Sequence, residues 1–219
     1  MNLSLKRYCS AFAGLLVLSG LGGCGSAPPD HTYRASQLYQ TCAPCHGTDG
    51  LGTDTPGTSS ATPAIAGLPA WYVTAQLTKF RVGARGKHPD DYEGLRMRPM
   101  SRYLRNDADT DLLASYIESM TPLKTVSTLD GDPAKGAGHF TACVACHQAD
   151  GGGMEALGAP PLTGTQDWYL VAQLQKFKSG IRGANELDTT GATMRPWALN
   201  LEDEQAMKDV VAHIQTLGK

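Results

Sequence analysis

Apolar residues recur at helical spacing along this chain of 219 residues, and they do so in matching segments of its two halves. Residues 107–120, DADTDLLASYIESM, begin with acidic side chains and then carry an apolar stripe that includes Leu113 and Ile117. Residues 202–217, EDEQAMKDVVAHIQTL, repeat this pattern near the C-terminus. No segment alternates between apolar and polar residues over a length typical of a strand. The pattern therefore predicts an all-α protein.

Two further pairs of segments indicate an internal duplication. Residues 71–86, WYVTAQLTKFRVGARG, and residues 168–183, WYLVAQLQKFKSGIRG, are identical at ten of sixteen positions and lie 97 residues apart. The segment MRPMSRYL, which starts at Met97, matches MRPWALNL, which starts at Met194, at the same spacing. The chain is therefore predicted to contain two copies, in tandem, of a module of about 90 residues.

The duplication sets the expected domain boundaries. We expect a first domain over residues 34–122, a linker over residues 123–131 with flanking turn residues, and a second domain over residues 132–219. Each domain should open with a helix, over residues 34–46 and residues 133–147. A module of this size buries little apolar surface by itself, so a group bound at its centre is expected to complete the core.

The N-terminus reads as an export signal and not as part of either domain. Residues 1–23 contain two basic residues and then a short apolar run that is too short to span a membrane. The run ends in LGGC, which resembles the lipobox of bacterial lipoproteins, so we expect an acylated Cys24 as the first mature residue. Residues 24–33 would then form a flexible tether. Cleavage after Ala27 is the alternative.

Composition and charge narrow the function classes. The chain is 41% hydrophobic and 18% charged with a formal net charge of −2, which is an ordinary globular composition with no basic excess for binding nucleic acid. Residues 31–125 contain ten Lys and Arg against nine Asp and Glu, whereas residues 126–219 contain seven against eleven. Several of the first module's arginines surround its Met97 segment, where they form either a field that steers a partner or an ordinary solvated face.

The motif Cys-x-x-Cys-His occurs once in each module. Its members are Cys42, Cys45 and His46 in the first copy, and Cys143, Cys146 and His147 in the second. A thioredoxin-like site is disfavoured because no strand–helix alternation surrounds either motif, and a zinc ribbon is disfavoured because each pair has its own histidine and its own module. The motif is the attachment signature of c-type haem, in which two thioethers hold the porphyrin and the adjacent imidazole binds the iron. We therefore predict two covalently bound haem c groups.

The second axial ligand of each iron should occur at matching places in the two copies. Met97 and Met194 satisfy this requirement, and each is followed two residues later by a proline that would fix a loop carrying the sulfur. The alternative is that both methionines fill gaps in the core. Met100 competes with Met97 in the first copy, but its counterpart is Trp197, which cannot bind iron.

With these motifs in place, the chain resembles dihaem cytochromes of the cytochrome c4 type, which consist of two class I cytochrome c domains in tandem. The Pro-x-Leu-x-Gly element of such domains matches PPLTG, residues 160–164, and its first copy is PAIAG, residues 63–67. The resemblance implies that the carbonyls of Pro63 and Pro160 accept a hydrogen bond from the haem histidines and orient them. Arg98 and Arg195, beside the methionines, are candidates for pairing with haem propionates or for an exposed surface.

Two ligands for each iron leave no open position for a substrate, so we expect an electron carrier and not an enzyme. The alternatives are a dihaem enzyme, such as a peroxidase or a sulfur-compound dehydrogenase, and a fixed haem subunit of a membrane oxidase or dehydrogenase complex. The expected partners are membrane-bound or periplasmic redox proteins, such as a quinol-oxidising complex or a terminal oxidase. The expected location is the periplasmic side of a bacterial membrane, with attachment through Cys24.

Overall fold

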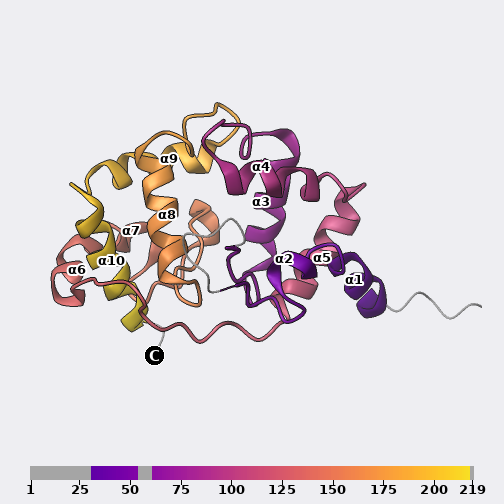
Figure 1. Ribbon diagram of the computed structural model, residues 1–219, viewed down its shortest axis with the longest axis horizontal. Coiled ribbons are helices and arrows are strands. Elements are labelled where there is room, and N and C mark those ends of the chain that lie inside the picture. The colour runs from indigo at the N-terminus through magenta and orange to yellow at the C-terminus, as the bar shows by residue number, and fades with distance from the viewer. Residues whose placement is uncertain (1–30, 54–60, 218–219) are drawn as a thin grey trace, which may run out of the picture.

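The computed structural model describes residues 31–53 and 61–217, and all regular structure in these residues is helical (Figure 1). Its elements are α1 (His31–Tyr39), α2 (Ala43–His46), α3 (Ala70–Val82), α4 (Tyr92–Ser101), α5 (Asp107–Glu118), α6 (Pro133–Phe140), α7 (Val144–His147), the 3-10 helix η1 (Glu155–Leu157), α8 (Asp167–Lys178), α9 (Thr189–Leu199) and α10 (Glu204–Leu217). The prediction of an all-α protein is confirmed. The expected signal peptide and Cys24 lie outside the described residues.

The two halves of the chain form two domains that lie side by side, α1–α5 in one and α6–α10 in the other (Figure 1). The same order of elements recurs in both, with a short helix at the haem motif followed by two helices and a final packing helix. Helices α3 and α8 face the centre of the molecule, and residues 121–132 run along one edge between the domains without helix. The duplication in the sequence is therefore a duplication of structure.

Each domain has a core cluster in which its first and last helices meet. In the first domain Tyr39 of α1 packs with Leu113 and Ile117 of α5. In the second domain Phe140 of α6 packs with Val210 and other apolar residues of α10. These residues lie on the apolar stripes of the final helices, so burying one stripe of each helix accounts for the pairing.

Helices α6 and α10 approach so closely that only glycine fits at one position. A Cβ atom on Gly136 would lie 1.9 Å from the backbone oxygen of Asp209, which belongs to α10. The matching position of the first domain, Ala35, is 2% exposed, so the helix pair of that domain accommodates a methyl group there. The crossing in the second domain is thus the tighter of the two.

Gly136→Ala is expected to destabilise the second domain by about 1–3 kcal/mol, because a backbone atom cannot move aside as a side chain would. Thermal unfolding followed by circular dichroism should show a lower midpoint. The matched control is Lys135→Ala at the exposed neighbouring position, which should change stability by no more than about 0.5 kcal/mol. Equal midpoints for both variants would contradict the tight crossing.

The structure corrects three local expectations. Each predicted first helix is interrupted, since α1 ends at Tyr39 and α6 at Phe140 before the haem motif starts a separate four-residue helix. The expected tether of residues 24–33 is wrong at its end, because α1 already begins at His31. Met97 and Met194 were expected in loops but lie inside α4 and α9.

The prolines near these methionines, Pro99 and Pro196, stand in the last turns of α4 and α9. At that position they do not prevent Met97 and Met194 from lying in the helices. A proline there removes one hydrogen bond, and each helix ends within three residues of it. The expectation of a loop therefore overestimated how far the proline disrupts the helix. The sulfur atoms are instead carried on helices whose starts are capped by aspartate side chains.

Candidate haem sites

The short helices α2 and α7 bring the attachment residues of each site into one turn. The backbone N–H of His46 donates to the oxygen of Cys42 at 2.9 Å, and His147 donates to Cys143 at the same distance. Both histidines are buried, whereas the four cysteines are half-buried or exposed and form no disulfide. Two thiols and an imidazole on one turn are the donor set that covalent haem attachment requires.

A hydrogen bond fixes the orientation of each histidine ring. The Nδ1–H of His46 donates to the oxygen of Pro63 at 2.8 Å, and the Nδ1–H of His147 donates to that of Pro160 at 2.8 Å. These are the contacts that the family resemblance implied. With the proton held on Nδ1, the lone pair of Nε2 is free to bind a metal. Burial lowers the pKa of both histidines despite the proline contact, so the rings are kept in the neutral form that binds iron.

A glycine in each domain lets the proline segment reach the histidine. Gly52 and Gly153 have φ of +73° and +80°, and a Cβ atom on either would lie within 2.7 Å of the backbone around Pro63 or Pro160. Their N–H groups donate to the oxygens of His46 at 2.8 Å and His147 at 3.0 Å. The pattern Cys-x-x-Cys-His did not reveal these glycines. Their signal in the sequence is that both follow the histidine by six residues.

The predicted ligands of the second site line one cavity. A cavity of about 380 Å³ is bordered by Cys143, Cys146, His147 and Met194, together with apolar side chains such as Leu174 and Val210. It also reaches the first domain, where Tyr72 and Lys79 of α3 contribute to its wall. An imidazole, two thiols and a thioether around one apolar cavity fit a covalently attached haem.

In the first site, Met97 and Met100 differ in their surroundings. Met97 packs on the core cluster of the first domain together with Cys42, whereas Met100 is 43% exposed. The counterpart of Met100, Trp197, is 42% exposed. This burial supports Met97 as the axial ligand, which stays a prediction, as does the same role for Met194.

Four arginines, two of them buried and two half-buried, give a second test of whether haem fits. Each has an Nε atom without a hydrogen-bond partner in the described part of the chain, namely Arg85, Arg98, Arg182 and Arg195. They form two repeat pairs that are 97 residues apart. Buried donors without acceptors are rare in proteins, and the carboxylates of haem propionates are acceptors of matching charge. The residues therefore fit two anionic haem groups.

The domains also exchange hydrogen bonds across their boundary, which sequence reasoning missed. The Arg85 side chain of the first domain donates to Gln173 of the second domain at 3.3 Å, and although burial acts to raise the pKa of Tyr169, the Arg85 charge helps to lower it. The Gln166 side chain accepts from the N–H of Ala64 at 2.8 Å. The sequence carries one sign of this boundary, because polar residues are identical in the two copies of the Trp-Tyr segment. An interface between two similar domains uses the same surface of each, so the same side chains occur in both copies.

Comparison with known proteins agrees with this geometry. The family model described as Cytochrome c matches the chain twice, at residues 33–121 and 133–218. A thiosulfate dehydrogenase electron acceptor of Stutzerimonas stutzeri is 30% identical over an alignment of 191 residues that covers 82% of each chain. The solved structure of Acidithiobacillus ferrooxidans cytochrome c4 is 27% identical and has a TM-score of 0.65, covering 81% of this chain and 99% of that one.

A larger structure also contains the same arrangement. A thiosulfate dehydrogenase from Marichromatium purpuratum matches with a TM-score of 0.64 and 27% identity, over 84% of this chain but 40% of the other. Both modules of this chain are thus accounted for, each with its own haem motif. The chain belongs to the cytochrome c family and is a dihaem, cytochrome c4-like electron-transfer protein with two covalently bound haem c groups.

Proposed function

We propose that this chain is the electron acceptor of an exported dehydrogenase that oxidises a sulfur compound, with thiosulfate as the first substrate to test. The observation that carries the proposal is the match to the thiosulfate dehydrogenase electron acceptor, which spans 82% of both chains and both domains. The similarity to part of a solved thiosulfate dehydrogenase supports it. Electrons would then pass from this chain to another redox protein of the respiratory chain.

The arrangement of ligands supports a carrier and not an enzyme. Haem supplies reversible one-electron chemistry when bound. His46 and Met97 in the first domain, and His147 and Met194 in the second, would fill both axial positions and leave none for a substrate. The buried, hydrogen-bonded histidines hold their rings in one orientation, so little rearrangement is needed when the charge changes.

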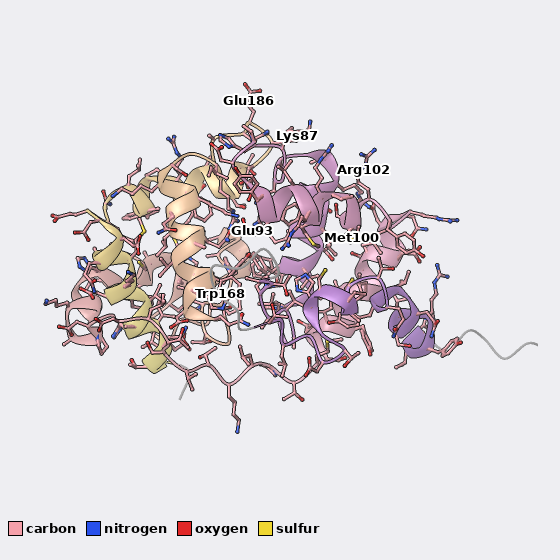
Figure 2. The ribbon with its side chains drawn as sticks, in the orientation of Figure 1. Lys87, Glu93, Met100, Arg102, Trp168 and Glu186 are labelled. Carbon is pink, nitrogen blue, oxygen red and sulfur yellow. The ribbon has the colours of Figure 1, made fainter. Side chains whose placement is uncertain are left out.

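The outer face of α4 and the turn that follows it offer a docking surface for the partner. Exposed apolar side chains, among them Met100 and Tyr103, lie beside the exposed Arg96, Arg102 and Arg105 (Figure 2 shows Arg102 and Met100). The matching positions of the second domain hold Thr193, Leu199 and Glu202, which carry no positive charge. An apolar centre with a basic rim fits a partner with an acidic rim, and it favours entry of electrons through the first domain.

The test follows reduction of the two-haem protein in a stopped-flow instrument after mixing with thiosulfate and a thiosulfate dehydrogenase. Reduction should require the enzyme. Arg96→Glu with Arg102→Glu should slow reduction about tenfold at low ionic strength, because opposite charges speed the encounter. The matched control, Lys135→Glu with Lys208→Glu on the second domain, should leave the rate unchanged.

Two outcomes would decide against the proposal. Reduction by thiosulfate alone would make the chain itself the dehydrogenase. Failure of the enzyme to reduce the chain under any salt condition would exclude it as the acceptor, and a membrane oxidase or a quinol-oxidising complex would become the partner to test.

We also propose that the protein acts on the periplasmic side of a bacterial membrane and is held there by acylation of Cys24. The support is the sequence LGGC at the end of a short apolar run, in a segment outside the described residues. Within residues 31–53 and 61–217, no helix is both long and apolar enough to cross a membrane. A lipid on Cys24 would keep the acceptor near membrane-bound redox proteins.

A further inference from the structure

We propose that each domain positions the axial methionine of the other domain through a reciprocal pair of buried ion pairs. Lys176 of the second domain holds the start of α4, which carries Met97, and Lys79 of the first domain holds the start of α9, which carries Met194. The two lysines are positioning residues, since they act on the haem ligands through a helix. The inference rests on the two methionines as ligands and is independent of which partner supplies the electrons.

Each methionine-bearing helix starts at a buried aspartate. Asp91 caps α4 by accepting from the N–H of Gly94 at 3.3 Å, and Asp188 caps α9 by accepting from the N–H of Gly191 at 3.2 Å. The two aspartates are 2% and 0% exposed. A Cβ atom on either glycine would lie within 2.2 Å of the capping carboxylate, so the cap requires glycine at that position.

The counter-charge of each cap comes from the other domain. Lys79 Nζ lies 2.6 Å from Asp188 Oδ1, and Lys176 Nζ lies 2.6 Å from Asp91 Oδ1. Both lysine side chains are 13% exposed. Lys176 also contacts Glu93 at 2.8 Å, and Figure 2 shows Glu93 between the two domains. A buried carboxylate is stable only with a partner, so each cap depends on the neighbouring domain.

The charge state of the second cap agrees with this dependence. Burial alone would raise the pKa of Asp188, but the hydrogen bond and charge of Lys79, with the charges of Arg182 and Arg85, lower it below the ordinary value. The carboxylate therefore stays ionised in the interior. Removal of the lysine would leave a buried negative charge that only the nearby arginines oppose.

The spacing along each helix connects the ion pair to the haem ligand. Met97 follows Asp91 by six residues, and Met194 follows Asp188 by six residues, so cap and sulfur are separated by about 9 Å of helix. A shift at the start of such a helix moves its second turn as well. Since Lys79 and Lys176 are repeat counterparts, and so are Asp91 and Asp188, the crossed pairs form an interface with approximate two-fold symmetry.

The test uses the full-length protein with both haems and measures how readily added imidazole displaces methionine from the oxidised iron. The sulfur-to-iron band near the red end of the visible spectrum reports displacement. A Met97→His background leaves this band only on the second haem, and a Met194→His background leaves it only on the first. In these backgrounds, Lys79→Met should raise the imidazole affinity of the second haem at least about tenfold, and Lys176→Met should do so for the first. The reason is that breaking a buried ion pair is costly, so the start of the methionine-bearing helix is held less firmly.

The crossed pattern separates positioning from a general loss of stability. Lys79→Met should leave the first haem unchanged although the lysine belongs to that domain, and Lys79→Arg should restore much of the wild-type behaviour. Lys135→Met, at an exposed lysine, is the matched control and should change neither haem. If Lys79→Met fails to fold, the double variant Lys79→Met, Asp188→Asn removes the unpaired charge but keeps a capping side chain, and it should still show the raised affinity at the second haem.

An effect of Lys79→Met on the first haem alone, an equal effect on both haems, or no effect in either variant would overturn the proposal. The outcome does not depend on thiosulfate or on any dehydrogenase. Failure of the proposed function therefore leaves this inference intact, and the reverse also holds.

Discussion

Replacing Met194 with histidine is expected to lower the reduction potential of the second haem by on the order of 100–300 mV, because axial ligands set haem potentials over a range of about 0.8 V. Imidazole stabilises the ferric state more than a thioether does, so the iron should stay low-spin while becoming harder to reduce. Met97→His should do the same to the first haem. An optical redox titration, read with the sulfur-to-iron band, measures both effects.

Met100→Leu is the matched control for the first domain, because Met100 lies three residues from Met97 but is exposed. It should leave both potentials and both sulfur bands intact. If Met100→Leu removes the band of one haem while Met97→His leaves it, the assignment of Met97 is wrong. Met194 has no such competitor, since the matching position is Trp197.

The local features of each site could be predicted because short-range chemistry determines them. The spacing of Cys42, Cys45 and His46 places three side chains on one helical turn whatever surrounds it. The contact from His46 to Pro63 followed from the family resemblance, and the structure has it at 2.8 Å. The all-α fold followed from the apolar stripes of the final helices, where burial and helical periodicity point to the same structure.

The arrangement of the two domains could not be read from the sequence, because it depends on contacts between distant residues. Lys79 and Asp188 are 109 residues apart, and helical periodicity shows which face is polar without showing what that face contacts. Lys79, Gln76 and Arg85 are identical in both copies, but this identity was interpreted only as a sign of duplication. A polar residue repeated in both copies of a duplicated segment is evidence for an interface between the copies.

The errors over α4 and α9 have a related cause. Pro99 and Pro196 led to the expectation of loops, although proline is tolerated when the helix ends soon after it. The capping aspartates, Asp91 and Asp188, each precede a helix start and would have indicated one. The helical position of the predicted methionine ligands would have a functional consequence, because a capped helix holds a side chain more rigidly than a loop does and gives the other domain a point of contact.

The N-terminal anchor can be tested independently of the haem sites. Cys24→Ser should move the protein from the membrane fraction to the soluble fraction of the periplasm, because acyl chains on that cysteine would be its attachment and more than one chain makes attachment lasting. Both haems should stay attached and reducible, since Cys24 precedes the first domain by several residues. Electron delivery to membrane oxidases should fall in intact membranes, because the local concentration of the tethered carrier is lost, while reduction by a soluble donor should not change. Fractionation measures the location of the protein, and mass spectrometry identifies its mature N-terminus.

A wild-type protein that is already soluble and starts at Pro28 would exclude the anchor, and the carrier would then diffuse between its partners.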